Sequence, residues 1–163
     1  MNTLKLAIAF TIGLLLTGCR SEEQPYRKQT SKVTGKLSVN GQPPGESLLV
    51  VCNTITEEDT SHPSFSETMA QPDGTFEIST YQQGDGVPNG EYALTIVWGK
   101  LNLMTRSYGG PDKLKGAYSD PKTSKITFTV KDAPVDLGSI DLTIPDGKVE
   151  EPTIEFSTGS KER

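Results

Sequence analysis

Apolar and polar residues alternate with period two in residues 33–39, so that an extended chain would have one apolar and one polar face. The same alternation returns at residues 76–78, 92–98, 126–130 and 137–144. Because side chains of a strand point alternately to opposite faces, each of these segments is predicted to be a β-strand with one buried face.

The rest of the chain between these segments is less regular. Residues 48–52 are continuously apolar, which indicates a strand buried on both faces or in the core of a sandwich, and residues 65–70 predict a weaker strand. A bulge is expected near Gly138 in the last strand. The irregular stretch from Gly99 to Ser124 contains the only segment suited to a helical turn, residues 112–118.

Turn sequences separate the predicted strands. Asn40-Gly41 and Pro72-Asp73-Gly74 combine residues that preset or tolerate turn conformations, and Pro88-Asn89-Gly90 does the same before a strong strand. Many short strands without a helix of normal length are typical of an all-β fold. We therefore predict one antiparallel, Greek-key-type β-sandwich of about seven strands over residues 32–145.

Residues 1–18 have the pattern of an export signal. Lys5 supplies a short positive region, and the apolar residues 6–16 follow it. As a helix this apolar segment would extend only about 16 Å, against roughly 30 Å for the bilayer core. The segment is therefore expected to be a cleaved signal peptide and not a membrane span.

The signal ends in Leu16-Thr17-Gly18-Cys19, which resembles the lipobox of bacterial lipoproteins. The resemblance implies cleavage before Cys19 and acylation of its thiol and amino group, which would anchor the protein to a bacterial membrane. Arg20 stands where an Asp would favour the inner membrane, so the outer membrane is slightly favoured. The alternative is an ordinary secretory signal with a chance cysteine.

The two ends of the mature chain are polar. Residues 20–31 are predicted to form a flexible tether after Cys19, and residues 146–163 a disordered tail. The formal net charge of the 163-residue chain is −5 and no basic block is present, which argues against a nucleic-acid partner.

Several of the motifs resemble carboxypeptidase-regulatory-like domains. Val33-Thr34-Gly35-Lys36-Leu37 with Asn40-Gly41-Gln42-Pro43 resembles their opening strand and turn, Asp73-Gly74-Thr75-Phe76 their D-G-x-F turn, and residues 90–96 their G-x-Y strand. Residues 80–92 and 112–124 also look like segments of small bacterial lipoproteins built on this domain. The resemblance implies a transthyretin-like (prealbumin-like) sandwich that has no catalytic activity and needs no cofactor.

Candidate chemistry is sparse. His62 is the only histidine and lies in a polar loop without a nucleophile-elbow motif. With Cys19 lipidated, Cys52 has no partner thiol, and its apolar neighbours predict a buried free cysteine. Metal-ligand spacing is also absent from the sequence, so neither an enzyme nor a metal site is predicted.

The segment Gly99–Ser124 is the best candidate for a functional surface, because loops of this length are usually functional or disordered. Arg106, Tyr108 and Tyr118 are its candidate ligand-binding residues, whereas Trp98 before it is expected to belong to the core. Two functions remain open: a structural or protein-interaction module of the cell envelope, or a module that binds carbohydrate or peptide through this segment.

Overall fold

A computed structural model of the chain describes residues 25–56, 59–102, 104–105 and 107–144. The predicted signal peptide, Cys19, Arg106 and the tail at 146–163 lie outside the described residues.

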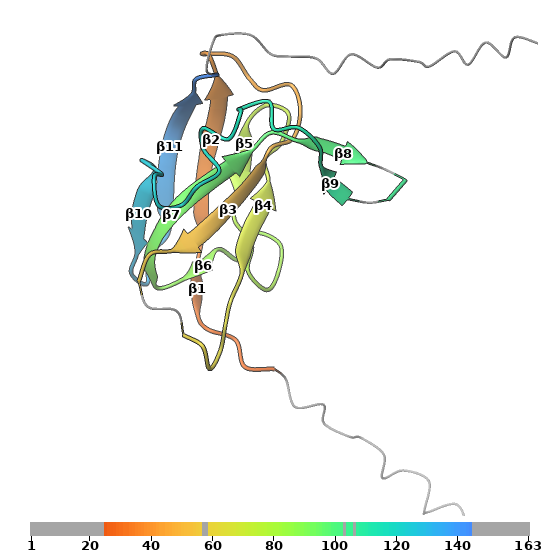
Figure 1. Cartoon of the computed structure of the whole chain (residues 1–163). Helices are drawn as coiled ribbons and strands as arrows, with labels where there is room; N and C mark the ends of the chain where they lie inside the picture. Colours follow the sequence, from red (N-terminus) through yellow and green to blue (C-terminus); the bar gives the residue numbers. More distant parts are fainter. Residues whose placement is uncertain (1–24, 57–58, 103, 106, 145–163) are drawn as a thin grey trace, which may run out of the picture.

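The described residues form short strands joined by turns and loops (Figure 1). The strands are β1 (Thr30–Ser31), β2 (Val33–Val39), β3 (Leu49–Thr54), β4 (Ser66–Met69), β5 (Thr75–Glu77), β6 (Val87–Pro88), β7 (Gly90–Val97), β8 (Lys100–Asn102), β9 (Ser107–Gly109), β10 (Thr127–Val130) and β11 (Val135–Leu142). Every strand predicted from the sequence is present, with ends that differ by at most two residues.

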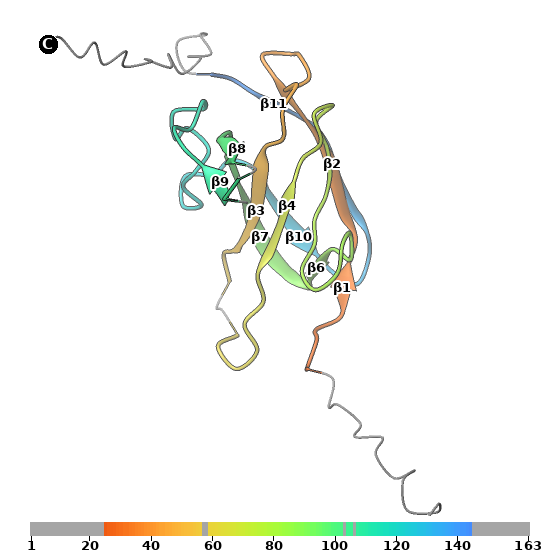
Figure 2. The same ribbon diagram turned by 90° about the vertical axis from the view of Figure 1, so that its right-hand side faces the viewer.

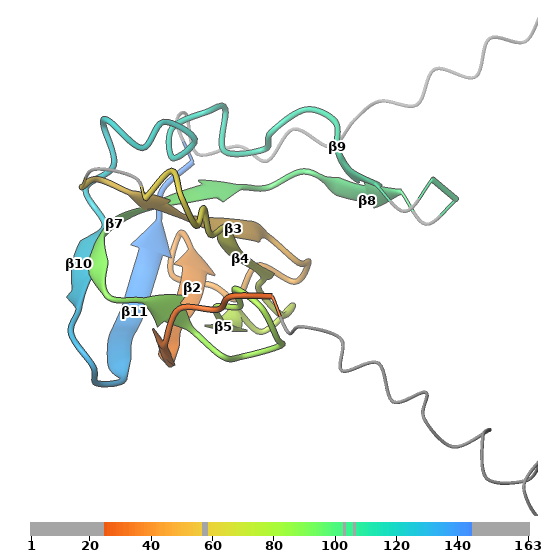
Figure 3. The same ribbon diagram turned by 90° about the horizontal axis from the view of Figure 1, so that it is seen from below.

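Two sheets face each other across the core, as the view from below shows (Figure 3). One sheet has the strand order β10-β7-β3-β4 and is antiparallel throughout. The other has the order β11-β2-β5. The all-β sandwich expected from the sequence is therefore confirmed.

One strand pair departs from the antiparallel prediction, because β11 runs parallel to β2. The pairing extends from Val135 opposite Val33 to Leu142 opposite Val39, with a register shift between Asp136 and Ser139. Gly138 lies in this shift with φ of +66°, so the predicted bulge is confirmed. Alternation predicts that a segment is a strand but carries no information on its partner's direction.

The core is built from the inward faces predicted by the alternation. Val33 and Leu37 of β2 are fully buried, and so is Ile96 of β7. Gly35 faces the core between the two β2 residues, where a Cβ atom would lie 2.6 Å from Cζ of Phe76. The space left by the missing side chain of Gly35 is filled by the aromatic ring of Phe76 from β5.

The N-terminal boundary of the sandwich needs a correction. Thr30 and Ser31, assigned to the flexible tether, form β1 and pair with Pro88 and Val87 of β6. The preceding residues also contact the domain: Lys28 forms an ion pair of 3.1 Å with Asp59. We call residues 26–31 the N-terminal strap. Their polar composition suggested a solvated linker because the partners lie far away in sequence.

Residues 112–118 do not form the helical turn considered for them. Lys115 and Gly116 have positive φ values of 54° and 74°, which a right-handed helix excludes. The segment instead makes successive tight turns, such as the one closed by Lys115 N–H and the Asp112 carbonyl oxygen (2.9 Å). In the part of the chain that the structure describes, no helix has the length and hydrophobicity needed to cross a membrane.

Candidate functional site

The segment Gly99–Ser124 begins as a hairpin that projects from the sandwich (Figures 1 and 2). Strands β8 and β9 pair with each other from Lys100 opposite Gly109 to Asn102 opposite Ser107, and they pair with no other strand. Met104, between them, is 96% exposed. The Asn102 side chain accepts hydrogen bonds from the backbone N–H groups of Met104 and Thr105 at 3.0 and 3.1 Å, which orders this part of the turn.

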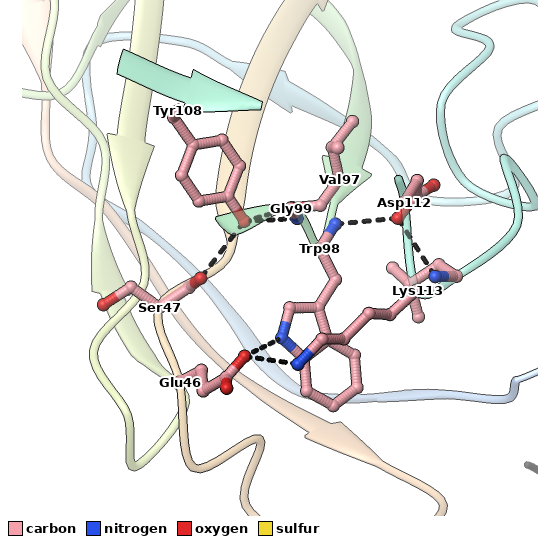
Figure 4. A network of polar contacts seen from close by, with 9 residues as sticks. Glu46, Ser47, Val97, Trp98, Gly99, Tyr108, Asp112 and Lys113 are labelled. Atoms are coloured by element: carbon pink, nitrogen blue, oxygen red, sulfur yellow. Dashed lines mark hydrogen bonds and ion pairs between the residues drawn. The ribbon is translucent and has the colours of Figure 1, made fainter. Parts of the chain in front are cut away.

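Tyr108 fixes the base of the hairpin. Its hydroxyl oxygen accepts a hydrogen bond from Gly99 N–H at 2.7 Å (Figure 4). The same hydroxyl lies 3.2 Å from the carbonyl oxygen of Ser47 and 3.1 Å from that of Val97, to which it donates. Burial raises the pKa of Tyr108 above its ordinary value of 10.0, so the hydroxyl stays protonated and able to donate.

Trp98, at the end of β7, joins three segments of the chain. Its ring is buried, with 5% of the residue exposed, which confirms its predicted place in the core. The indole Nε1–H donates to Oε2 of Glu46 at 3.0 Å, and Lys113 Nζ donates to the same oxygen at 2.6 Å (Figure 4). The bond from Lys113 is the main reason why the pKa of Glu46 lies below its usual 4.5.

Asp112 holds the second half of the segment against β7. One carboxylate oxygen accepts from Trp98 N–H at 2.9 Å and from Leu114 N–H at 3.0 Å, and the other accepts from Gly116 N–H at 2.9 Å. The Lys113 N–H returns a bond to the Trp98 carbonyl oxygen at 3.0 Å. Leu114 is fully buried, so this half of the segment belongs to the rigid body of the domain.

The hydroxyl of Tyr118, like that of Tyr108, forms a hydrogen bond with the backbone of the domain. The Tyr118 ring packs against the core, and the hydroxyl accepts a hydrogen bond from Thr143 N–H at 2.8 Å. No hydrogen bond or ring contact among the described residues joins Tyr118 to Tyr108. The structure therefore shows no direct contact between the two predicted ligand-binding tyrosines, and Arg106 lies outside the residues it describes.

Sequence reasoning missed Glu46, Asp112 and Lys113, which organise this region. Glu46 lies 52 positions before Trp98 and 67 before Lys113, and no short-range pattern connects such distant residues. Only Asp112 had a local signal, because Pro111-Asp112 is a typical turn sequence whose carboxylate bonds backbone N–H groups two residues on.

The other candidate groups are far from reactive geometry. His62 is exposed, and its ring lies 4.1 Å from that of Tyr26 and its Nδ1 3.9 Å from Oδ2 of Asp59. Cys52 is a free, buried cysteine as predicted, and burial raises the pKa of its thiol to about 12. Within the described ranges, no three His, Cys, Asp or Glu side chains are grouped so as to hold a metal ion.

Two of the hollows that the described residues form on the surface of the sandwich have linings without any residue of Gly99–Ser124. The larger, about 570 Å³, lies over β2, β5 and β11 beside β4. The smaller, about 130 Å³, lies under the N-terminal strap, with Cys52 and Tyr92 in its wall and Lys28 and Asp59 among its lining residues.

Comparison with known proteins assigns no family. No protein-family model matches the chain, and no curated protein matches it. Among solved structures, the crystal structure of a 9R-lipoxygenase from Cyanothece is similar over 69% of this chain, with 17% identity and a TM-score of 0.33. The matched part spans only 16% of the lipoxygenase chain.

Proposed function

We propose that the chain is a lipid-anchored, extracytoplasmic protein of a bacterial envelope, which acts without catalysis by presenting the β8–β9 hairpin to a protein partner. The observation that carries the proposal is the contrast within Gly99–Ser124. The hairpin projects with Met104 exposed, whereas Tyr108 and the Trp98 contacts fix its base. Because the backbone of the hairpin is ordered before binding, a partner that buries Met104 gains apolar contact area without having to order the hairpin itself.

The position of the hairpin relative to the N-terminal strap supports an orientation in which the hairpin points away from the membrane. The strap and the β1–β6 pair lie at one end of the sandwich, and the hairpin lies toward the other (Figures 1 and 2). Seven residues lead from Cys19 to Tyr26, which span at most about 25 Å. With Cys19 lipidated, the end that carries β1 stays close to the membrane and the hairpin is directed away from it.

The surroundings of Cys52 and His62 support a role without catalysis. The Cys52 thiol, with its pKa of about 12, is protonated at neutral pH, and a thiol is a far weaker nucleophile than a thiolate. His62 is exposed, and in the part of the chain that the structure describes its ring lies beside the Tyr26 ring and Asp59 and forms no hydrogen bond with a serine or cysteine. A general base acts on a nucleophile within hydrogen-bond reach, which this arrangement does not offer.

A carbohydrate or peptide site built from Arg106, Tyr108 and Tyr118 gains no support from the two tyrosines. Both hydroxyls already bond backbone groups of the domain itself. Met104 on the hairpin is the exposed large apolar side chain among the described residues of the segment. A protein surface is the partner that fits a narrow apolar protrusion of this kind.

Site-specific photo-crosslinking in the native envelope tests the proposal. A photoreactive residue in place of Met104 in the full-length lipidated protein is expected to capture one defined envelope protein. Once that protein is purified, the Met104→Asp variant is expected to bind it more weakly than the wild type does. The same residue at Lys131, which is exposed in the turn between β10 and β11, serves as the control. Identical products from both positions, or unchanged binding by Met104→Asp, would contradict the proposal.

A further inference from the structure

An open groove of about 570 Å³ lies on the solvent-facing side of the three-stranded sheet. Its lining comes from β2, β4, β5 and β11 and from residues just outside them. The volume is in the range of small-molecule sites, but the lining is mainly polar, which is unlike the apolar pockets that take drug-like ligands. The groove is separate from the hairpin of the proposed function.

Strand register arranges the polar groups of the groove in two rows. Asp136 of β11 lies opposite Thr34 of β2, which lies opposite Glu77 of β5. The next row is formed in the same way by the three side chains of Ser139, Lys36 and Thr75. Because neighbouring strands are about 4.8 Å apart, each row offers hydrogen-bonding groups at a spacing similar to the width of a sugar ring.

Much of the hydrogen-bonding capacity of this groove is unused by the protein. Six of the lining side chains form no hydrogen bond or ion pair with another described residue: Thr34, Lys36, Thr68, Gln71, Gln83 and Ser139. Exposed polar residues elsewhere on the domain are often paired, as Ser38 is with Asp141 at 2.6 Å. Hydroxyl, amide and ammonium groups that are free to bond a ligand are therefore gathered in this groove.

The ladder between β4 and β5 is open where it borders the groove. Glu67 and Ser79 exchange both backbone hydrogen bonds, at 3.0 and 3.1 Å, and Gln71 N–H donates to the Thr75 carbonyl oxygen at 2.8 Å. The same register puts Met69 opposite Glu77 between them, but no β-bridge joins this pair. Both residues line the groove, so backbone polar groups at this position can bond a ligand.

We propose that this groove binds a neutral oligosaccharide. Hydroxyl and amide groups in rows on rigid strands match a ligand that carries hydroxyl groups along its whole length. Glu77 is already paired with Lys32 at 2.8 Å. This leaves one lysine, Lys36, and one carboxylate, Asp136, in the lining, so the groove does not select an anion. The partly buried Met69 supplies an apolar surface for the C–H face of a sugar ring.

An extended peptide fits the groove less well. A peptide strand needs a continuous free edge, and the bonds of Glu67 with Ser79 and of Gln71 with Thr75 close the β4–β5 ladder on both sides of the gap. It also needs apolar pockets for alternate side chains, whereas Phe76, the aromatic residue in the lining, is only 4% exposed.

Titration calorimetry of the full-length protein in detergent micelles tests the proposal, with chitotetraose, maltotetraose and cellotetraose as probes. At least one is expected to bind with a dissociation constant below about 1 mM. Lys36→Ala and Gln71→Ala are each expected to weaken that binding about five-fold, the effect of losing one or two hydrogen bonds. Lys131→Ala removes an exposed lysine outside the groove and is the matched control.

Three outcomes would overturn the inference: no heat from any of the three sugars up to about 10 mM, an equal loss of binding in Lys131→Ala, or binding only of a hexapeptide of alternating threonine and valine. Thermal unfolding of each variant shows whether it is folded. Met104→Asp is expected to keep its sugar binding, so failure of the hairpin proposal and failure of this one can be told apart.

Discussion

The ammonium group of Lys113 lies over the indole ring of Trp98, with Nζ 4.9 Å from the ring centroid. Both residues donate to Oε2 of Glu46, so one carboxylate oxygen connects the β2–β3 loop, the end of β7 and the segment after β9. The cation–π contact and the two charge-assisted bonds reinforce one another, because each holds the lysine in the geometry that the others need. This triangle fixes the base from which the hairpin projects.

Replacing Glu46 with alanine is expected to lower the free energy of unfolding by about 1–2 kcal/mol. The variant leaves Lys113, whose side chain is only 16% exposed, without its carboxylate, and it leaves the Trp98 indole without its acceptor. Denaturant unfolding followed by the fluorescence of the single tryptophan measures the change. Glu91→Ala, at an exposed glutamate, is the control, and an equal loss in both variants would contradict the role of Glu46.

Acid is expected to weaken the same contact. The Lys113 bond holds the pKa of Glu46 in the folded protein below the ordinary 4.5, so the folded state favours the carboxylate. This contribution to stability is complete above pH 4.5 and is lost as the pH falls through the lowered pKa. Unfolding free energies between pH 7 and pH 3 test the expectation. Glu46→Gln should lose less stability than the wild type over this range, and parallel curves would count against it.

Tyr108→Phe tests whether the hydroxyl at the hairpin base is structural. Removing it leaves Gly99 N–H without its acceptor, which is expected to cost about 1–2 kcal/mol and to speed hydrogen exchange in β8 and β9. Tyr26→Phe removes a hydroxyl from a residue that is 64% exposed and should change neither quantity. Unchanged exchange in Tyr108→Phe would show that the hairpin is held by other contacts.

Local patterns predicted the strands far better than their assembly. Residues 33–39 alternate strictly because one face of β2 is buried, and Gly138 marked the bulge because glycine tolerates its positive φ. The hairpin at Lys100–Gly109 was missed, since an exposed two-stranded ribbon needs no apolar face. The parallel β2–β11 pair and the Glu46 contacts join residues that are far apart in sequence. The spacing of apolar residues along the chain does not predict such contacts.

For the candidate site, the sequence singled out the segment Gly99–Ser124 but not the contacts that its tyrosines make. Aromatic residues in a long loop suggested ligand contacts, whereas Tyr108 and Tyr118 bond the backbone of the domain. The groove over β2, β5 and β11 was not foreseen, because polar residues on the outer face of a strand carry the same pattern whether they line a hollow or simply face solvent.

Cys52 is expected to react slowly with thiol reagents in the folded protein. The residue is 6% exposed, and a thiol pKa of about 12 leaves about one thiolate in ten thousand molecules at pH 8. Cys19→Ala makes Cys52 the single thiol of the chain, so its reaction with an iodoacetamide can be followed by mass. Labelling should become fast in denaturant, and fast labelling of the folded protein would exclude a buried thiol.

Cys19→Ala is also expected to move the protein from the membrane fraction to the soluble extracytoplasmic fraction. Acyl chains each contribute about 0.8 kcal/mol per buried methylene group, and the variant cannot be acylated. Cys52→Ala, which removes the other cysteine, should stay with the membrane. Sedimentation and immunoblotting distinguish the two, and a Cys19→Ala protein that still sediments would contradict the proposed anchor.

The parallel pairing of β2 and β11 gives the domain a mechanical property. Both strands run in the same direction, so the chain enters the pair at one end and leaves it at the other (Figure 1). A force that pulls the two ends apart acts along the strands in opposite senses and loads the ladder bonds in shear, all at once. When the sandwich is pulled at its two ends, the hydrogen bonds between β2 and β11 bear the load together and do not break one after another.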